Sequence, residues 1–235
     1  MNAVPGFVLV AGPLVGASSW EPTASRLRAA GAHVQIPDVL ARAGRVPSWR
    51  EWTSHLLDLS SAEAAPVLVG HSSASTLVVD LATRMTVRGL IIVDGDIPPA
   101  RGLAPPVRPA LRDFIAGLAD ENGLLPPWSQ WWVNDASRAR LVGIDVLARD
   151  PQALRSFEAD LPRMTRAWFD DAIDLAPWDH IPAGYVQLSP IYDHAAEEAS
   201  RRGWPVRRLH GTHLDPTLRP DETAAAIQAI CGEWV

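Results

Sequence analysis

The stretch PVLVGHSSAS, residues 66–75, decides the fold, because a short apolar strand in it runs directly into a serine between small residues. We expect a buried strand that ends at Gly70, followed by a buried helix over residues 75–81. A serine at such a sharp turn has strained backbone angles, so its neighbours two positions away must be small, as Gly70 and Ala74 are. Ser72 is therefore predicted to project its hydroxyl above a sheet as a nucleophile, with the free N–H groups of the helix N-terminus beneath it.

Apolar runs typical of buried parallel strands alternate with helical patterns on both sides of this turn. The alternation predicts an α/β fold with a mainly parallel sheet and helices on both faces. We expect further strands at residues 7–10, 33–36, 89–93, 184–188 and 206–209, and helices at 20–30, 49–61, 193–202 and from about 220 to the end.

The alternation breaks between Ile97 and His180, where prolines are frequent and tryptophans cluster. Residues 1–96 and 181–235 are expected to form the α/β core. Residues 97–180 are expected to form a helical cap over it, with helical periodicity at 114–118 and 154–169.

Length and composition limit the classes of function. A chain of 235 residues fits one α/β domain with an inserted cap. The net charge of −6 and the absence of any run of like charge argue against a nucleic-acid partner. No apolar run reaches about 18 residues and no signal peptide is visible, so we expect a soluble cytoplasmic protein that acts on a small molecule, without a membrane partner. The single cysteine, Cys231, rules out an intramolecular disulfide and a thiolate metal cluster. No cofactor or metal is expected, and a monomer and a homodimer both remain open.

A serine nucleophile needs an imidazole to take its proton and a carboxylate to hold that imidazole. His213 fits best as the base, because it follows the last predicted strand on a loop that reaches the carboxyl end of the sheet. His210 is the close rival, while His71 is expected beside the serine with its side chain turned away. A metal site of His210, His213 and Asp215 is the alternative, but this spacing matches no recurring zinc pattern.

Two aspartates follow predicted strands and compete for the role of the acid. Asp94 ends the apolar run 90–93, where a carboxylate must find a partner, one strand over from Ser72. Asp193 follows residues 188–192 but also begins a predicted helix, where it has an alternative role as an N-cap. We favour Asp94 and keep Asp193 open.

These residues resemble the α/β-hydrolase superfamily over nearly the whole chain apart from the cap. The resemblance rests on residues 7–10, the loop AGPLVGASSW at 11–20, the turn at Ser72 and the late Gly211-Thr212-His213. The first half is most similar to small esterases and hydroxynitrile lyases, whereas an acid at Asp94 resembles the thioesterases of polyketide and peptide synthesis. The resemblance implies a Ser-His-Asp hydrolase that acts on an ester or thioester.

The same resemblance implies an oxyanion hole made by the Ser73 N–H and an N–H of the loop after the first strand. The matching loop position is Pro13, which has no N–H. The second donor is then expected from Leu14, from the side chain of Ser18 or Ser19, or is absent.

The cap suggests the character of the substrate. Trp128, Trp131 and Trp132, together with Pro13, are expected to contact a largely apolar small molecule. The alternative is that these tryptophans form the cap's own core. Loss of one oxyanion donor typically costs about 3 kcal/mol of transition-state stabilisation. A second function therefore stays open, in which the same pocket serves a lyase, an epimerase, a cyclase or a ligand-binding protein.

Overall fold

The computed structural model describes residues 5–60 and 65–234, and its centre is a six-stranded sheet in the order β2-β1-β3-β4-β7-β8. All neighbouring strands in it run parallel, which confirms the predicted parallel sheet. The first four residues lie outside the described residues, and they include part of the N-terminal stretch that shows no signal-peptide pattern. Ser61 and Val235, the last residues of two predicted helices, also lie outside them. The strands are β1 (Phe7–Val10), β2 (Val34–Gln35), β3 (Val67–His71), β4 (Gly89–Val93), β7 (Ala183–Gln187) and β8 (Val206–Arg208).

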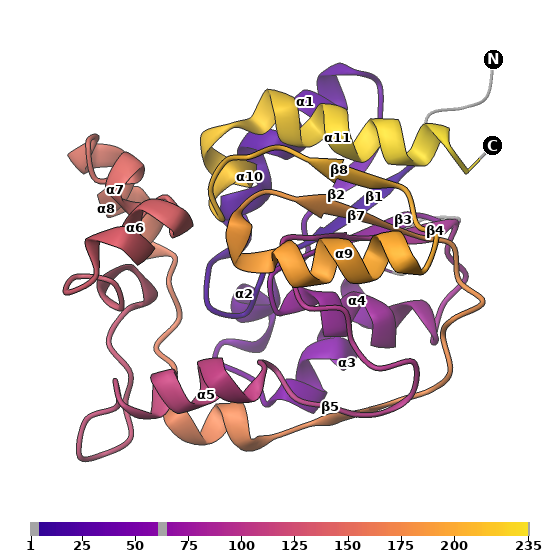
Figure 1. Ribbon diagram of the computed structural model, residues 1–235. Helices are drawn as coiled ribbons and strands as arrows, with labels where there is room; N and C mark the ends of the chain where they lie inside the picture. The colour runs from indigo at the N-terminus through magenta and orange to yellow at the C-terminus, as the bar shows by residue number, and fades with distance from the viewer. Residues whose placement is uncertain (1–4, 61–64, 235) are drawn as a thin grey trace.

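Helices cover both faces of this sheet (Figure 1). Successive side chains of a strand point to opposite faces, so Val8 and Leu68 enter one core and Phe7 and Val67 the other. Burial on both faces explains why these strands are apolar throughout. One face carries α1 (Glu21–Ala29), α10 (Asp215–Leu218) and α11 (Pro220–Gly232), and the other α3 (Trp49–Ser60), α4 (Ala74–Ala82) and α9 (Asp193–Arg201), with the short α2 (Val39–Ala43) beside α3.

The register of the central strands brings three loops to one edge. Val10 pairs with Gly70, which pairs with Ile92, and Ile92 pairs with Tyr185. Because the strands are parallel, the segments after β1, β3 and β4 all leave the sheet at this carboxyl edge. The loop that contains Pro13, the turn at Ser72, and Asp94 therefore meet there.

Residues 97–180 leave the sheet and build the region that covers this edge (Figure 1). The predicted helix over 154–169 is wrong in extent, because α8 ends at Ala159 and Pro162 cannot continue a helix. The sequence analysis also missed a two-stranded antiparallel ribbon, whose Ala104, Ile173 and Leu175 pack into the core beside α4. The elements of this segment are β5 (Gly102–Ala104), α5 (Pro109–Ala116), η2 (Trp128–Gln130), α6 (Ala136–Val142), α7 (Ile144–Leu147), α8 (Pro151–Ala159), η3 (Arg166–Asp170) and β6 (Ile173–Leu175). That residues 97–180 form a cap domain separate from the core stays a prediction.

None of the helices in the described parts of the chain combines the length and the apolar character that crossing a membrane requires.

Candidate active site

Ser72 occupies the turn between β3 and α4 with a φ of +58°, in the left-handed region. Two glycines make this conformation possible. A Cβ on Gly70 would lie 2.7 Å from the Ala74 carbonyl oxygen, and one on Gly95 would lie 2.3 Å from the Ser72 carbonyl oxygen. The Ser72 N–H donates to the Val93 carbonyl at 3.0 Å, which ties the turn to the neighbouring strand. The sheet therefore holds the strained serine with its side chain partly exposed at the carboxyl edge.

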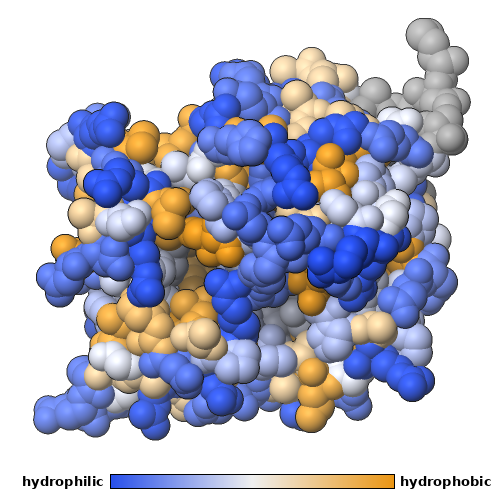
Figure 2. Space-filling view, in the orientation of Figure 1, coloured by the Kyte–Doolittle hydropathy of each residue, from blue (hydrophilic) through white to orange (hydrophobic). Residues whose placement is uncertain are grey.

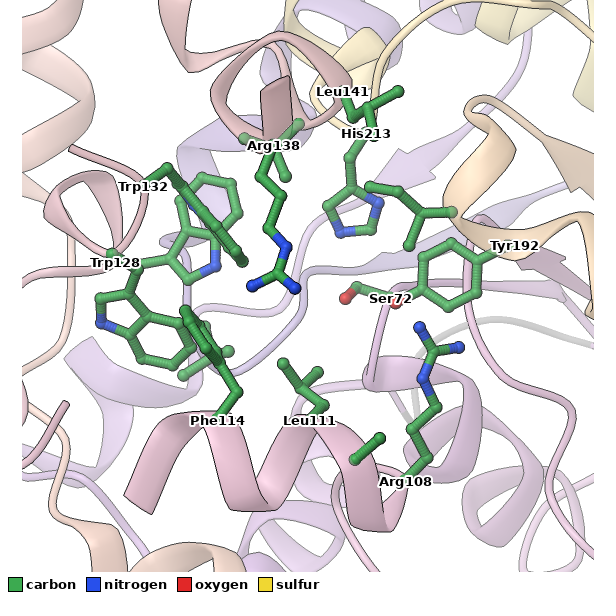
Figure 3. Close-up of a pocket in the computed structure, with 15 residues that line it drawn as sticks. Ser72, Arg108, Leu111, Phe114, Trp128, Trp132, Arg138, Leu141, Tyr192 and His213 are labelled. Atoms are coloured by element: carbon green, nitrogen blue, oxygen red, sulfur yellow. The ribbon is translucent and has the colours of Figure 1, made fainter. Parts of the chain in front are cut away.

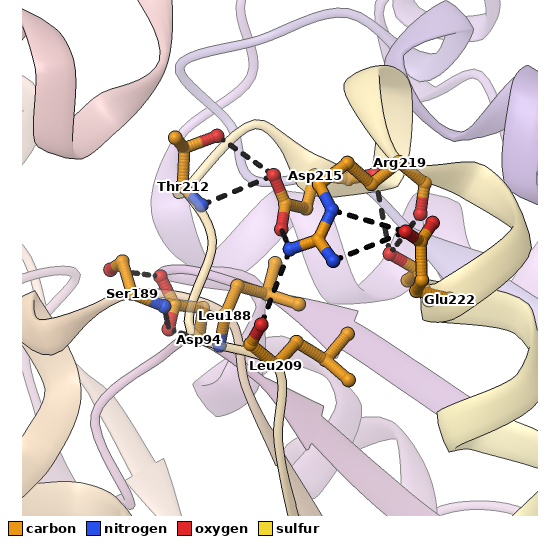
Figure 4. Close-up of polar contacts among 9 residues, drawn as sticks. Asp94, Leu188, Ser189, Leu209, Thr212, Asp215, Arg219 and Glu222 are labelled. Carbon is orange, nitrogen blue, oxygen red and sulfur yellow. Dashed lines mark hydrogen bonds and ion pairs between the residues drawn. The ribbon is translucent and has the colours of Figure 1, made fainter.

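Asp94 lies at the end of β4, fully buried and also at a positive φ of 44°. Its carboxylate accepts hydrogen bonds from the Leu188 and Ser189 N–H groups at 2.8 and 2.9 Å and from the Ser189 hydroxyl at 2.7 Å (Figure 4). A fourth bond joins Asp94 Oδ2 to His213 Nδ1 at 2.7 Å. A carboxylate at Nδ1 requires a proton there, which leaves the His213 Nε2 as the acceptor of the neutral ring.

The backbone around His213 is anchored on both sides. Asp215 accepts hydrogen bonds from the Thr212 N–H and hydroxyl at 3.1 and 2.8 Å and from Arg219 at 3.3 Å (Figure 4). Burial raises the pKa of the Asp215 carboxyl, and the Thr212 and Arg219 contacts oppose that rise. From the cap side, the Leu141 carbonyl at the end of α6 accepts from the His213 N–H at 3.0 Å. The imidazole is thus held by the core and by the segment that covers it.

The sequence suggested that the His71 side chain turns away from the site, but in the structure it lies beside His213. Its ring lies 4.4 Å from that of His213 and 6.0 Å from that of Trp20, measured between centroids. The His71 Nε2–H donates to the His213 carbonyl at 2.9 Å, while its Nδ1 has no partner among the described residues. Burial, and next the nearby His213, lower the pKa of His71 well below its ordinary value. His71 therefore supports His213 as a neutral ring.

This neutral, buried ring should make stability depend on pH. Below about pH 6.5 the unfolded chain binds a proton at His71, whereas the folded protein does not. Proton binding therefore favours the unfolded chain, so the folded state is most stable above that pH and loses stability as the pH falls. The wild-type free energy of unfolding should decrease between pH 6.5 and 5 by up to about 1.4 kcal/mol per pH unit from this group. Urea unfolding of wild type and His71→Gln at several pH values measures it. The variant should show the shallower slope, and equal slopes would contradict the assignment.

The alternatives for the acid and the base lie elsewhere. Asp193 is exposed at the start of α9 and accepts a hydrogen bond from the Gln187 side chain. His210, also exposed, lines a separate hollow of about 230 Å³ together with Asp193, whereas His213 and Ser72 line the same cavity. No group of three or more His, Cys, Asp or Glu side chains in residues 5–60 and 65–234 is placed to share a metal ion.

A recess of about 20 Å³ lies beside Ser72, where the sequence analysis expected an oxyanion hole. Leu14 and Ser73 line it, but Pro13 is buried and lines neither this recess nor the larger cavities. The Ser18 hydroxyl donates to Asp160 at 2.7 Å and the Ser19 hydroxyl to the Gly16 carbonyl at 2.8 Å, so both side chains are engaged elsewhere. The N–H groups of Leu14 and Ser73 donate to no other described residue. These two groups remain as donors for an oxygen in the recess.

A cavity of about 260 Å³ opens in front of Ser72 and His213. Hydrophobic surface gathers around the corresponding hollow in Figure 2, and Figure 3 shows the aromatic side chains that face it. Trp128, Trp131 and Trp132 line this cavity and also belong to a buried apolar cluster that includes most of the cap's core, and their contact with a substrate stays a prediction. Trp178 instead packs against the sheet and donates to the Pro99 carbonyl at 2.8 Å.

Three polar residues of the cavity were missed by the sequence analysis: Arg108, Arg138 and Tyr192. Tyr192 ends the short helix η4 (Pro190–Tyr192), directly before Asp193, and its ring stacks on that of His213 at 5.5 Å between centroids. Burial, then Asp96 and Asp94, raise the pKa of the phenol, while a hydrogen bond with Ser72 opposes the rise. Tyr192 therefore stays protonated at neutral pH. The sequence does not mark Arg108 or Arg138 as cavity residues, because nothing in the residues around them distinguishes them from the other arginines of the chain.

A parallel α/β sheet with a strained serine at its carboxyl edge and a buried His–Asp pair beside it defines a site of the α/β-hydrolase type. The profile of the alpha/beta hydrolase family matches residues 7–226, and the chain belongs to this family. No curated protein matches the chain by sequence.

Solved structures share the fold at low sequence identity. A tomato methylketone synthase I variant complexed with beta-ketoheptanoate superposes with a TM-score of 0.75 at 14% identity, over 100% of both chains. Polyneuridine aldehyde esterase gives 0.71 at 14% identity, over 97% of this chain and 99% of that one. An extracellular alpha/beta-hydrolase from a Paenibacillus species gives 0.69 at 18% identity, over 95% and 99%. These similarities establish the fold.

Proposed function

We propose that the protein is a serine hydrolase that cleaves an ester or thioester of a largely apolar small molecule. The observation that carries this proposal is the 2.7 Å bond between His213 Nδ1 and Asp94 Oδ2, at the sheet edge where Ser72 and His213 line one cavity. The bond fixes the tautomer in which His213 Nε2 can accept a proton.

The reaction follows from these positions. His213 Nε2 takes the proton of the Ser72 hydroxyl as Oγ attacks the carbonyl carbon, and Asp94 stabilises the imidazolium that forms. The oxyanion accepts hydrogen bonds from the Ser73 and Leu14 N–H groups. His213 then gives the proton to the leaving alcohol or thiol. A water molecule, deprotonated by the same imidazole, attacks the acyl-enzyme and releases the acid.

The walls of the cavity support an apolar substrate. Phe114 stacks on Trp132 at 5.5 Å, and Trp128 lies 6.5 Å from His213 between ring centroids. Such walls exclude water from the reacting bond and strengthen the hydrogen bonds at the oxyanion.

A chromogenic ester tests the proposal on the purified wild-type protein. With 4-nitrophenyl hexanoate we expect release of 4-nitrophenolate. A fluorophosphonate probe should add the mass of one phosphonyl group per protein molecule, because an activated serine forms covalent adducts with both reagents. Stopped-flow absorbance and intact-protein mass spectrometry measure the two reactions, with heat-denatured protein as the control. Neither release nor labelling would contradict a hydrolase.

A non-hydrolytic function is the second candidate, and Pro13 is the observation that favours it. The family position of one oxyanion donor lacks an N–H here, so the hole depends on Leu14. A structural neighbour is named as a synthase, so the fold also serves other chemistry. In that case Ser72 and His213 would carry out acid–base steps of a lyase, epimerase or cyclase, and no acyl-enzyme would form.

A further inference from the structure

We propose that the substrate carries a carboxylate as well as its apolar body, and that Arg138 of the cap binds this carboxylate. The inference rests on the proposed function, because it names the class of ester or thioester that the cavity accepts. A monoester or monothioester of a dicarboxylic acid has the required chemistry.

The guanidinium of Arg138 has free donors that face the cavity. The residue lies on α6, and its guanidinium extends toward the space in front of Ser72 (Figure 3). Its ion pair with Asp135 is made through Nε at 3.4 Å, and neither Nη donates to a described residue. If Arg138 only stabilised the surface of α6, its ion pair with Asp135 would be sufficient. The two Nη groups are left to bind an oxyanion in the forked geometry that suits a carboxylate.

Phe114 holds this guanidinium in place. The Arg138 Cζ lies 5.1 Å from the centroid of the Phe114 ring, which itself stacks on Trp132. A cation over an aromatic face is attracted to it and loses less freedom when it binds a ligand. The arginine is thus oriented before the substrate arrives.

A second arginine adds positive charge to the same cavity. Arg108 precedes α5, and its Cζ lies 5.6 Å from the Tyr192 ring centroid. Its Nη1 is already shared between Asp96 and His194, each at 3.2 Å. Arg108 is thus held by two partners through one nitrogen, whereas neither Nη group of Arg138 donates to a described residue.

The ion-pair partners of these two arginines, Asp135 and Asp96, lie outside the described lining of the cavity. The cavity has Arg108 and Arg138 but neither Asp nor Glu in its wall, and the rest of the lining is mostly apolar. The Arg138 side chain is 53% exposed, so its contribution to binding rests on the forked hydrogen bonds to a carboxylate rather than on a desolvated charge. A neutral apolar substrate would fill the cavity and leave the two Arg138 Nη groups without a hydrogen-bond acceptor.

The position of Arg138 relative to Ser72 indicates which end of the acyl group bears the carboxylate. Figure 3 shows the Arg138 guanidinium and Ser72 apart from each other in the cavity, with Leu111 on the wall below and Phe114 on the side of the guanidinium away from Ser72. A carbonyl at Ser72 therefore directs the remainder of an acyl chain along apolar side chains toward the guanidinium. The carboxylate belongs at the far end of the acyl group.

Two esters of equal chain length test this inference. The 4-nitrophenyl monoester of adipic acid carries a terminal carboxylate, and 4-nitrophenyl hexanoate ends in a methyl group. We expect wild type to prefer the adipate ester, and Arg138→Gln to reduce the ratio of the two kcat/KM values about tenfold or more, mainly through KM, because a charged hydrogen-bond partner is lost. Arg149→Gln, which changes an exposed cap arginine outside the cavity, should keep the wild-type ratio. An equal ratio in wild type and Arg138→Gln would overturn the inference.

A binding measurement separates this inference from the proposed function. Quenching of tryptophan fluorescence reports ligands in the cavity, and hexanoate and hexanamide differ in charge with the same chain. Hexanoate should bind wild type about tenfold more tightly than hexanamide does, and Arg138→Gln should remove the difference. This result without any ester hydrolysis would refute the hydrolase and keep the carboxylate site. Ester hydrolysis with no preference for hexanoate in binding would refute the carboxylate site alone.

Discussion

Replacement of Asp94 by Asn is expected to reduce kcat for 4-nitrophenyl hexanoate by a factor on the order of 10⁴. The carboxylate accepts a hydrogen bond from the His213 Nδ1–H at 2.7 Å, and three further bonds from Leu188 and Ser189 fix its orientation. An amide that turns its NH₂ group to Nδ1 forces the proton onto Nε2, which then cannot take the proton of Ser72. The loss should fall on kcat, since the lining of the substrate cavity is unchanged.

Asp193→Asn is the matched control for this prediction. The Asp193 side chain is exposed and paired with Gln187, away from the imidazole, so its rate should stay within about twofold of wild type. Thermal unfolding of both variants shows whether each is folded, because loss of a buried carboxylate also affects stability. A rate near wild type in Asp94→Asn together with a loss of several orders of magnitude in Asp193→Asn would reverse the assignment of the acid.

Ser72→Ala is expected to lower kcat by a factor on the order of 10⁴ to 10⁶ and to abolish labelling by the fluorophosphonate. The hydroxyl is the atom that forms the acyl-enzyme, and no change elsewhere in the cavity replaces it. Alanine at a φ of +58° keeps the strain of the turn, so the gain or loss in folding stability should be small beside the loss of rate.

The control for Ser72→Ala is Ser200→Ala, which removes an exposed hydroxyl on α9 that bonds only to the Ala196 carbonyl among the described residues. This variant should be labelled like wild type. If Ser72→Ala continued to turn over the ester, the proposal of a covalent mechanism would be wrong, and His213 would act as a base on water or on the substrate directly.

Much of the fold could be predicted because it depends on local patterns. Each central strand is a short apolar run, since both of its faces are buried, and the turn at Ser72 requires small neighbours that can be read as Gly70 and Ala74. The cap was harder. Its short helices end at turns and prolines, and the ribbon of β5 and β6 has three residues in each strand, too few for a periodicity to emerge.

The site divides in the same way. Ser72 was predictable from its own turn, and Asp94 and His213 from their places after strands, because parallel strands bring such positions to one edge. His71 was misjudged because it ends β3 on the face that Trp20 covers, and the packing of the His213 loop against that face leaves no local pattern in the sequence.

The sequence by itself determined the parallel α/β architecture, the strained serine and the short set of histidines and aspartates that could serve it. Only the tertiary structure decided that Asp94, rather than Asp193, bonds to His213, and that Arg138 shares a cavity with Ser72. The physical reason is that hydrogen bonds and ion pairs depend on distances of about 3 Å between residues far apart in the chain. The Asp94–His213 distance is set where the loops after the strands meet at the sheet edge, the position of Arg138 is set where the cap packs over that edge, and no local pattern records either.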